Sequence, residues 1–108
     1  MNRNIIQLLA AAALLSAAGA AHASSEEAWQ QLAADVEAKC KKAAVAIEKP
    51  VAAVDPFGTS HYGLALLTGK PKGAKGLVAQ ICVYDKQKKT VEIGSELDAG
   101  KLGLTPAK

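Results

Sequence analysis

The chain contains few of the residues that proteins use to recognise nucleic acids. Arg3 is its only arginine, and aromatic residues make up 4% of the sequence. A nucleic-acid interface usually combines a dense basic stripe with arginine or aromatic side chains that contact the bases. Here the lysines are scattered along the chain, and the formal net charge is only +3. Nucleic acid is therefore not an expected partner.

Residues that bind transition metals or cofactors are equally scarce. Beyond residue 23 the sequence has one histidine, His61, and no methionine, so a nitrogen and sulfur site would have to use Cys40 and Cys82. The acidic residues near the C-terminus lack the spacing of an EF-hand, and no glycine-rich cofactor fingerprint is present. A CxxC pair, the usual form of a reactive thiol in an oxidising compartment, is also missing. We therefore predict no metal, no cofactor and no catalytic residue.

The N-terminus has the pattern of a cleaved signal peptide over residues 1–23. Arg3 supplies the positive charge, "IIQLLAAAALLSAAGA" the apolar region, and Ala21-His22-Ala23 an A-x-A cleavage site. This segment is too short and too rich in alanine for a membrane span. The mature chain is expected to start at Ser24 and to lie in the periplasm or outside the cell, without inserting into the membrane after cleavage.

The mature chain, residues 24–108, is long enough for one small domain. A domain of this size buries only about 60 to 65% of the surface of its unfolded chain, so a covalent link would help it to stay folded. Two cysteines in an exported protein favour a disulfide, and we predict one between Cys40 and Cys82.

One long amphipathic helix is predicted at the start of the mature chain. Ser24 or Ser25 can cap it, and Pro50 is expected to end it. Its apolar positions recur every three or four residues and form one stripe that includes Cys40. The members of the stripe are Trp29, Leu32, Ala33, Val36, Cys40, Ala43 and Ile47.

Three short strands are predicted to follow, at residues 61–68, 77–84 and 90–94, joined by two polar hairpin loops. Residues 50–60, with two prolines and a glycine, are expected to form an irregular connection, and the tail from residue 95 to be weakly structured. The predicted fold class is α+β, with one helix packed on a three-stranded antiparallel meander.

The expected strand pairing divides the side chains between two faces, because they alternate along a strand. Closing the first hairpin on its glycines places Leu64 opposite Ile81 and Gly63 opposite Cys82, and the second hairpin places Val91 beside Val83. The predicted disulfide then docks the helix on the face that holds Cys82, Gly63 and Ala65. The other face is the more apolar and holds Tyr62, Leu64, Leu66, Leu77, Ala79, Ile81, Val83, Val91 and Ile93.

Two alternatives follow for this apolar face. The connection and the tail could cover it through Val51, Val54, Phe57, Leu97, Leu102 and Leu104. Otherwise it is an exposed contact surface for a protein partner or for a second copy of the chain, as in a homodimer through the sheet face. The candidate partner-binding residues are then Tyr62, Leu64, Leu66, Leu77, Ile81, Val83, Val91, Ile93, Phe57 and His61.

The glycine-rich segment "TGKPKGAKG" carries Lys70, Lys72 and Lys75. It lacks the spacing of a phosphate-binding loop, so a flexible hairpin loop is the simpler interpretation, although its lysines could face an acidic partner.

Taken together, these patterns predict a small exported, non-catalytic protein that binds another protein, such as an inhibitor, an immunity-type protein or an accessory protein of the bacterial envelope. Two alternatives stay open. One is a small-ligand-binding domain with its site between the sheet and the 50–60 loop. The other is a small hydrolase that uses His61 and a nearby carboxylate.

Overall fold

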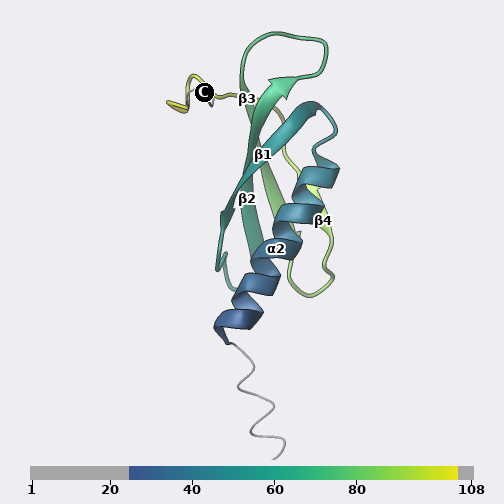
Figure 1. Ribbon diagram of the computed structural model, residues 1–108, viewed down its shortest axis with the longest axis vertical. Helices are drawn as coiled ribbons and strands as arrows, with labels where there is room; N and C mark the ends of the chain where they lie inside the picture. Colours follow the sequence, from purple (N-terminus) through teal and green to yellow (C-terminus); the bar gives the residue numbers. More distant parts are fainter. Residues whose placement is uncertain (1–24, 105–108) are drawn as a thin grey trace, which may run out of the picture.

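The computed structural model describes residues 25–104, which form one helix packed on one face of an antiparallel sheet (Figure 1). The strand order is β1-β2-β3-β4, and β5 pairs with β3 next to β4. The elements are α2 Glu26–Ala43, β1 Ile47–Asp55, β2 Tyr62–Pro71, β3 Val78–Asp85, β4 Val91–Ile93 and β5 Leu97–Asp98. The predicted α+β class is confirmed, with five strands in place of three. The predicted signal peptide lies outside the described residues.

Helix α2 begins as its sequence predicts and ends earlier. The Ser25 hydroxyl accepts a hydrogen bond from the Ala28 amide at 3.2 Å, and Glu26 and Glu27 lie in the first turn. The helix stops at Ala43, seven residues before Pro50, so its predicted extension to residue 49 is wrong.

Strand β1 replaces the end of the predicted helix and the first half of the predicted connection. Its register against β2 shifts between Glu48 and Val51, and Lys49 has a φ of 46°. Such a bulge on an edge strand tolerates Pro50, which cannot donate to a neighbouring strand. Pairing with β2 therefore overrides the local helical pattern of this segment.

The β2–β3 hairpin differs from the prediction by two residues and keeps every side chain on its expected face. Leu64 lies opposite Val83, Leu66 opposite Ile81, and Ala65 opposite Cys82. Strand β2 continues past Gly69 to Pro71, so the loop does not close on the predicted glycines. An even shift preserves the faces because side chains alternate with a period of two.

The β3–β4 hairpin differs by one residue, which moves Val91 and Ile93 to the helix side of the sheet. Val91 pairs with Tyr84 and Ile93 with Cys82, and both pack against the core. The turn sets this register, because the Asp85 amide donates to Thr90 O at 2.8 Å. The predicted place of Val91 and Ile93 on the uncovered face is wrong.

The predicted disulfide between Cys40 and Cys82 is confirmed and joins α2 to the centre of the sheet. The two Cα atoms lie 5.9 Å apart, and neither cysteine is exposed to solvent. A Cβ placed on Gly63 would lie 2.7 Å from Val36 Cγ2, so the glycine is needed where the helix approaches the sheet this closely. The core around the bond consists of Val36, Cys40, Ala44, Ile47, Ala65, Leu67, Cys82 and Tyr84.

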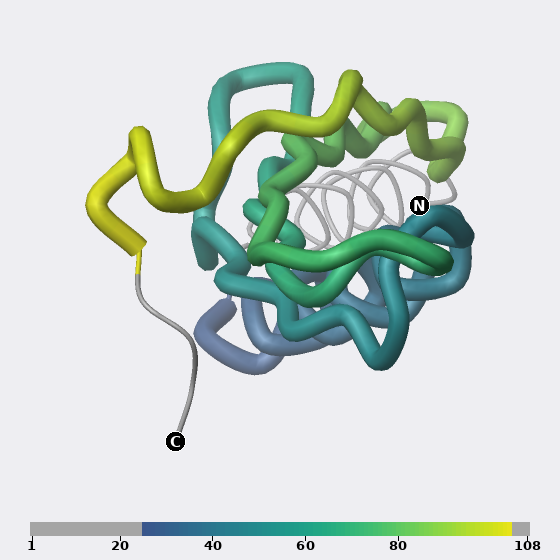
Figure 2. The backbone as a smooth tube through the Cα atoms, turned by 90° about the horizontal axis from the view of Figure 1, so that it is seen from above, coloured from purple at the N-terminus to yellow at the C-terminus, as the bar shows by residue number. Residues whose placement is uncertain are grey.

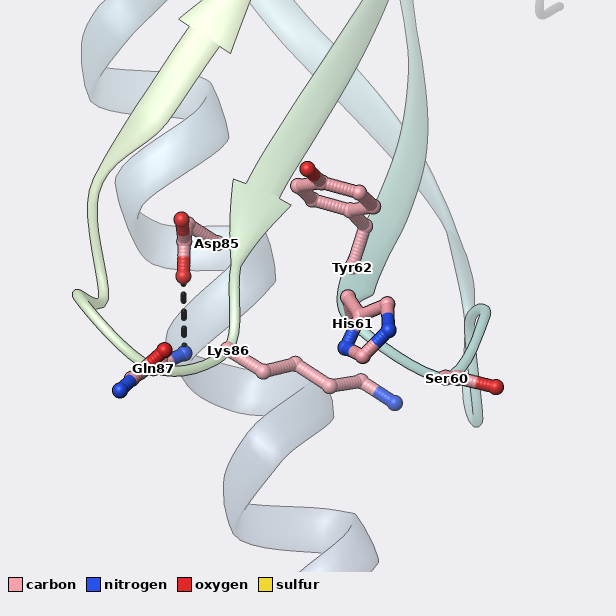
Figure 3. Close-up of a pocket in the computed structure, with 6 residues that line it drawn as sticks. All are labelled: Ser60, His61, Tyr62, Asp85, Lys86 and Gln87. Carbon is pink, nitrogen blue, oxygen red and sulfur yellow. Dashed lines mark hydrogen bonds between the residues drawn. The ribbon is translucent and has the colours of Figure 1, made fainter.

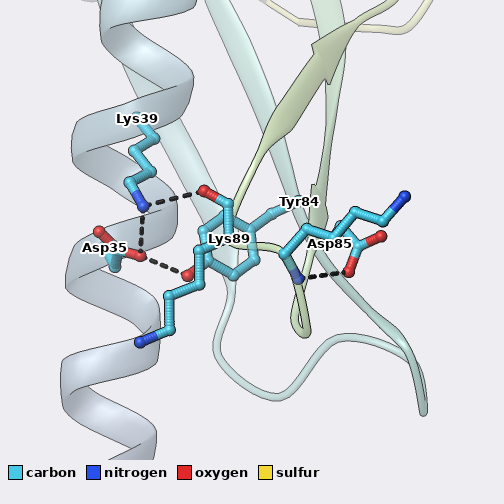
Figure 4. Close-up of polar contacts among 6 residues, drawn as sticks. Asp35, Lys39, Tyr84, Asp85 and Lys89 are labelled. Carbon is cyan, nitrogen blue, oxygen red and sulfur yellow. Dashed lines mark hydrogen bonds and ion pairs between the residues drawn. The ribbon is translucent and has the colours of Figure 1, made fainter.

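A polar cluster of Asp35, Lys39 and Tyr84 also joins α2 to the sheet (Figure 4). The buried Tyr84 hydroxyl donates to Asp35 Oδ2, which also pairs with Lys39 Nζ at 3.2 Å. Lys39 Nζ donates in turn to Lys89 O at 2.9 Å. The bond from Tyr84 is the main cause that lowers the pKa of Asp35, while burial and the Asp35 carboxylate raise the pKa of Tyr84 to about 12.

The raised pKa of Tyr84 predicts a specific loss of stability in alkali. Its folded pKa of about 12 exceeds the ordinary tyrosine value of 10.0, so its contribution to stability is complete below pH 10 and is lost as the pH rises through 12. Between these values the unfolding free energy of the wild type should fall by about 1 to 2 kcal/mol more than that of Tyr84→Phe. Denaturant melts across this range test the difference. Tyr62→Phe is the control and should follow the wild type, because Tyr62 is 45% exposed.

Candidate functional site

The face of the sheet opposite α2 presents apolar side chains from three adjacent strands. We call it the open face, and its members are Val51 and Ala53 of β1, Tyr62, Leu64 and Leu66 of β2, and Ile81 and Val83 of β3. Val51 is 59% exposed, Ile81 47% and Tyr62 45%. Leu64, Leu66 and Val83 are half-buried. The structure thus brings together five of the predicted partner-binding residues, while Leu77 lies just before β3.

The open face is flanked by side chains that the cross-strand register places there. Glu92 lies opposite Val83, so β4 presents Glu92 on this side of the sheet, where the sequence had predicted Val91 and Ile93. Ala53, Leu64, Leu66 and Ile81 line a shallow depression with Asp55 at its edge. The surface is therefore an apolar strip with charged side chains, including Asp55, Glu92 and Lys88, along its border.

The segments predicted as a cover leave most of this face uncovered. Residues 50–55 belong to the sheet itself, with Val54 packed on the helix side, so they do not form a loop over the open face. The tail reaches one end only, where Leu97 pairs with Ala79 and the Ala99 amide donates to Leu77 O at 3.1 Å. Figure 2 shows this segment (yellow) on the side away from α2. Ala79 is fully buried there.

Phe57 lies away from the open face, against the start of α2. Its ring meets Trp29 edge to face with 5.3 Å between the centroids, and Lys86 Nζ lies 5.4 Å from the centre of the Trp29 ring. Lys86 Nζ also donates to Phe57 O at 2.8 Å and Thr59 O at 2.6 Å. These contacts hold the tip of the β1–β2 hairpin. The sequence did not predict them, because only the fold brings the three segments together.

His61 lies at the same end of the molecule, in a depression lined by the loop before β2 and the turn after β3 (Figure 3). The Ser60 side chain points away from His61. The Asp85 carboxylate accepts hydrogen bonds from the amides of Lys88 at 3.0 Å and Gln87 at 2.9 Å, and these bonds lower its pKa. Within residues 25–104, no hydrogen bond joins His61 to a hydroxyl or a carboxylate.

No group of three or more His, Cys, Asp or Glu side chains in residues 25–104 could hold a metal ion. No helix among these residues is long and apolar enough to cross a membrane.

Lys70, Lys72 and Lys75 lie at the opposite end from His61, where β2 leads into β3 (Figure 1). The predicted site residues therefore occupy three separate places: the open face, the His61 end and the lysine-rich end. They do not form one shared pocket.

The chain matches no family model, no curated protein and no solved structure.

Proposed function

We propose that the protein is an exported, non-catalytic binding protein that holds a protein partner on its open face. It would act as an inhibitor, an immunity-type protein or an accessory protein of the bacterial envelope. The observation that carries the proposal is the exposure of Val51, Tyr62 and Ile81 on the side of the sheet that α2 leaves uncovered. The disulfide and the pattern of residues 1–23 support export.

The shape of the open face favours a protein over a small molecule. Small-molecule sites are concave and combine apolar walls with a few converging polar groups. Here the apolar side chains stand on three neighbouring strands with only a shallow depression among them. Exposed apolar patches of this kind usually mark protein–protein contacts, and Tyr is among the residues enriched in them.

The substitution Ile81→Glu tests the proposal at the centre of the face. A buried unpaired carboxylate at an interface is strongly unfavourable, so we expect the affinity for the partner to fall by at least roughly tenfold. The matched control is Ala34→Glu, which introduces the same charge on an exposed position of α2. Both variants should keep the thermal unfolding midpoint of the wild type within a few degrees, because both positions are exposed.

The measurement places a photo-crosslinking residue at position 66 of the wild type, Ile81→Glu and Ala34→Glu. Each protein is expressed in bacteria with its export signal, and crosslinking is carried out in the cell envelope. A single crosslinked product that Ile81→Glu removes and Ala34→Glu retains would support the proposal. Sedimentation of the purified protein shows whether this product is a second copy, since a dimer would then dissociate in Ile81→Glu. An envelope in which no product depends on Ile81 would refute the proposal.

A further inference from the structure

The end of the molecule that carries the C-terminus of α2 gathers lysines from separate segments of the chain (Figure 1). The Lys72 amide donates to Ala46 O at 2.9 Å, and Glu48 pairs with Lys70 across β1 and β2. These contacts place the β2–β3 connection beside the turn between α2 and β1. We call this region the basic end, and it consists of Lys42, Lys49, Lys70, Lys72, Lys75 and Val45.

The basic end carries more lysines than carboxylates. The ion pairs in residues 25–104 are Lys39 with Asp35 and Lys41 with Glu37, and neither includes a lysine of the basic end. Glu48 lies within residues 42–49 and 70–76, and β5 brings Asp98 opposite Val78 at the start of β3, so the five lysines outnumber these two carboxylates. Like charges repel one another, so the approach of an anionic surface lowers the electrostatic free energy of this region.

The basic end is convex and has an exposed apolar residue beside its lysines. A Cβ placed on Gly73 or Gly76 would have no heavy atom within 4 Å, so the connection between β2 and β3 projects freely. Val45, next to the contact between Ala46 and Lys72, is 70% exposed, more than the other large exposed hydrophobic residues of the described chain. A projecting surface cannot enclose a small anion, but it can meet a flat one.

The type of basic residue also indicates the kind of surface. Arginine binds individual phosphates or carboxylates through two parallel hydrogen bonds, and residues 25–104 contain no arginine. Lysine is a mobile point charge that suits the diffuse negative potential of a lipid bilayer, and a neighbouring apolar side chain can enter the headgroup layer. A surface that binds an acidic protein would instead be expected to hold arginine side chains in fixed positions opposite the carboxylates of that protein.

From these observations we infer that the basic end docks the protein on a bilayer containing anionic phospholipids. Lysines 42, 49, 70, 72 and 75 contact the headgroup phosphates, and Val45 enters the interface between them. The open face lies along the long side of the molecule, so docking by the basic end leaves it accessible (Figure 1). The inference is independent of the proposed protein partner.

Co-sedimentation of the mature protein with vesicles tests this docking. Phosphatidylcholine vesicles that contain phosphatidylglycerol should bind it, pure phosphatidylcholine vesicles should not, and binding should weaken as salt increases. The double substitution Lys72→Glu/Lys75→Glu should lower the partition coefficient by more than roughly tenfold. Val45→Ser should lower it by a smaller factor and leave its salt dependence unchanged.

The matched control is Lys88→Glu/Lys89→Glu, which changes the net charge equally at exposed positions in the β3–β4 turn, at the opposite end of the molecule. It should keep the partition coefficient of the wild type within about twofold. Equal losses in the two double variants would show that net charge alone drives binding and would overturn the docking site. Failure of the wild type to bind the anionic vesicles would overturn the inference as a whole. An acidic protein would then be the alternative partner of the basic end.

Discussion

Reduction of the Cys40–Cys82 disulfide is expected to lower the unfolding free energy by about 4 kcal/mol. The bond joins residues 42 positions apart and thereby removes many conformations from the unfolded chain. It also holds α2 against the sheet at a Cα–Cα distance of 5.9 Å. Domains of this length are stable by only a few kcal/mol, so the reduced protein should be close to unfolded at room temperature. Denaturant melts with and without reductant measure the loss.

The reduced wild type is the best comparison for this prediction, because it keeps both buried side chains and removes only the covalent bond. The variant Cys40→Ala/Cys82→Ala adds the loss of two buried sulfur atoms, so its melting midpoint should be no higher than that of the reduced protein. A reduced protein that unfolds at the same denaturant concentration as the oxidised one would contradict the prediction.

Gly63→Ala is the second substitution with a large expected effect, with a loss of about 1 to 3 kcal/mol. The new methyl group would lie 2.7 Å from Val36 Cγ2 and 3.3 Å from the Tyr84 Cβ and Cδ1 atoms. Relieving these contacts requires Val36 to change rotamer or α2 to move away from the sheet, and the packed core and the disulfide oppose both changes. Thermal or denaturant unfolding measures the loss directly.

A double-mutant cycle identifies the cause of that loss. In the Val36→Ala background the nearest atom is gone, so Gly63→Ala should cost less than it does in the wild type. Gly94→Ala is the matched control, since its Cβ would lie at an ordinary contact distance of 3.4 Å from Ile81 O. If Gly63→Ala costs the same in both backgrounds, the close approach of Val36 is not the reason for the glycine.

The open face shows how far strand patterns predict a surface. Leu64 and Ile81 kept their predicted side because the β2–β3 hairpin slipped by an even number of residues. Val91 and Ile93 changed sides because the β3–β4 hairpin slipped by one. The turn is fixed by the Asp85 carboxylate and by the positive φ of Lys89, neither of which the apolar pattern of the strands reveals.

Strand β1 shows the limit of local sequence patterns in a different way. Its segment continues the helical spacing of α2 up to Ile47 and contains Pro50, so local rules predict a helix and then a break. The strand forms because β2 offers an edge to pair with, and a bulge at Lys49 and Pro50 accommodates the proline. Val51 therefore belongs to the open face, which the sequence had assigned to the later strands alone.

The sequence by itself determined that α2 and the sheet are joined through Cys40 and Cys82, and that Leu64, Leu66 and Ile81 lie on the side away from the helix. Both follow from fixed periods, 3.6 residues in the helix and two in the strands, combined with one covalent bond. The tertiary structure alone decided that β1 extends the open face and that five lysines meet at the basic end. These features depend on pairings between distant segments, whose register is set by turns and bulges and not by the apolar pattern of each segment.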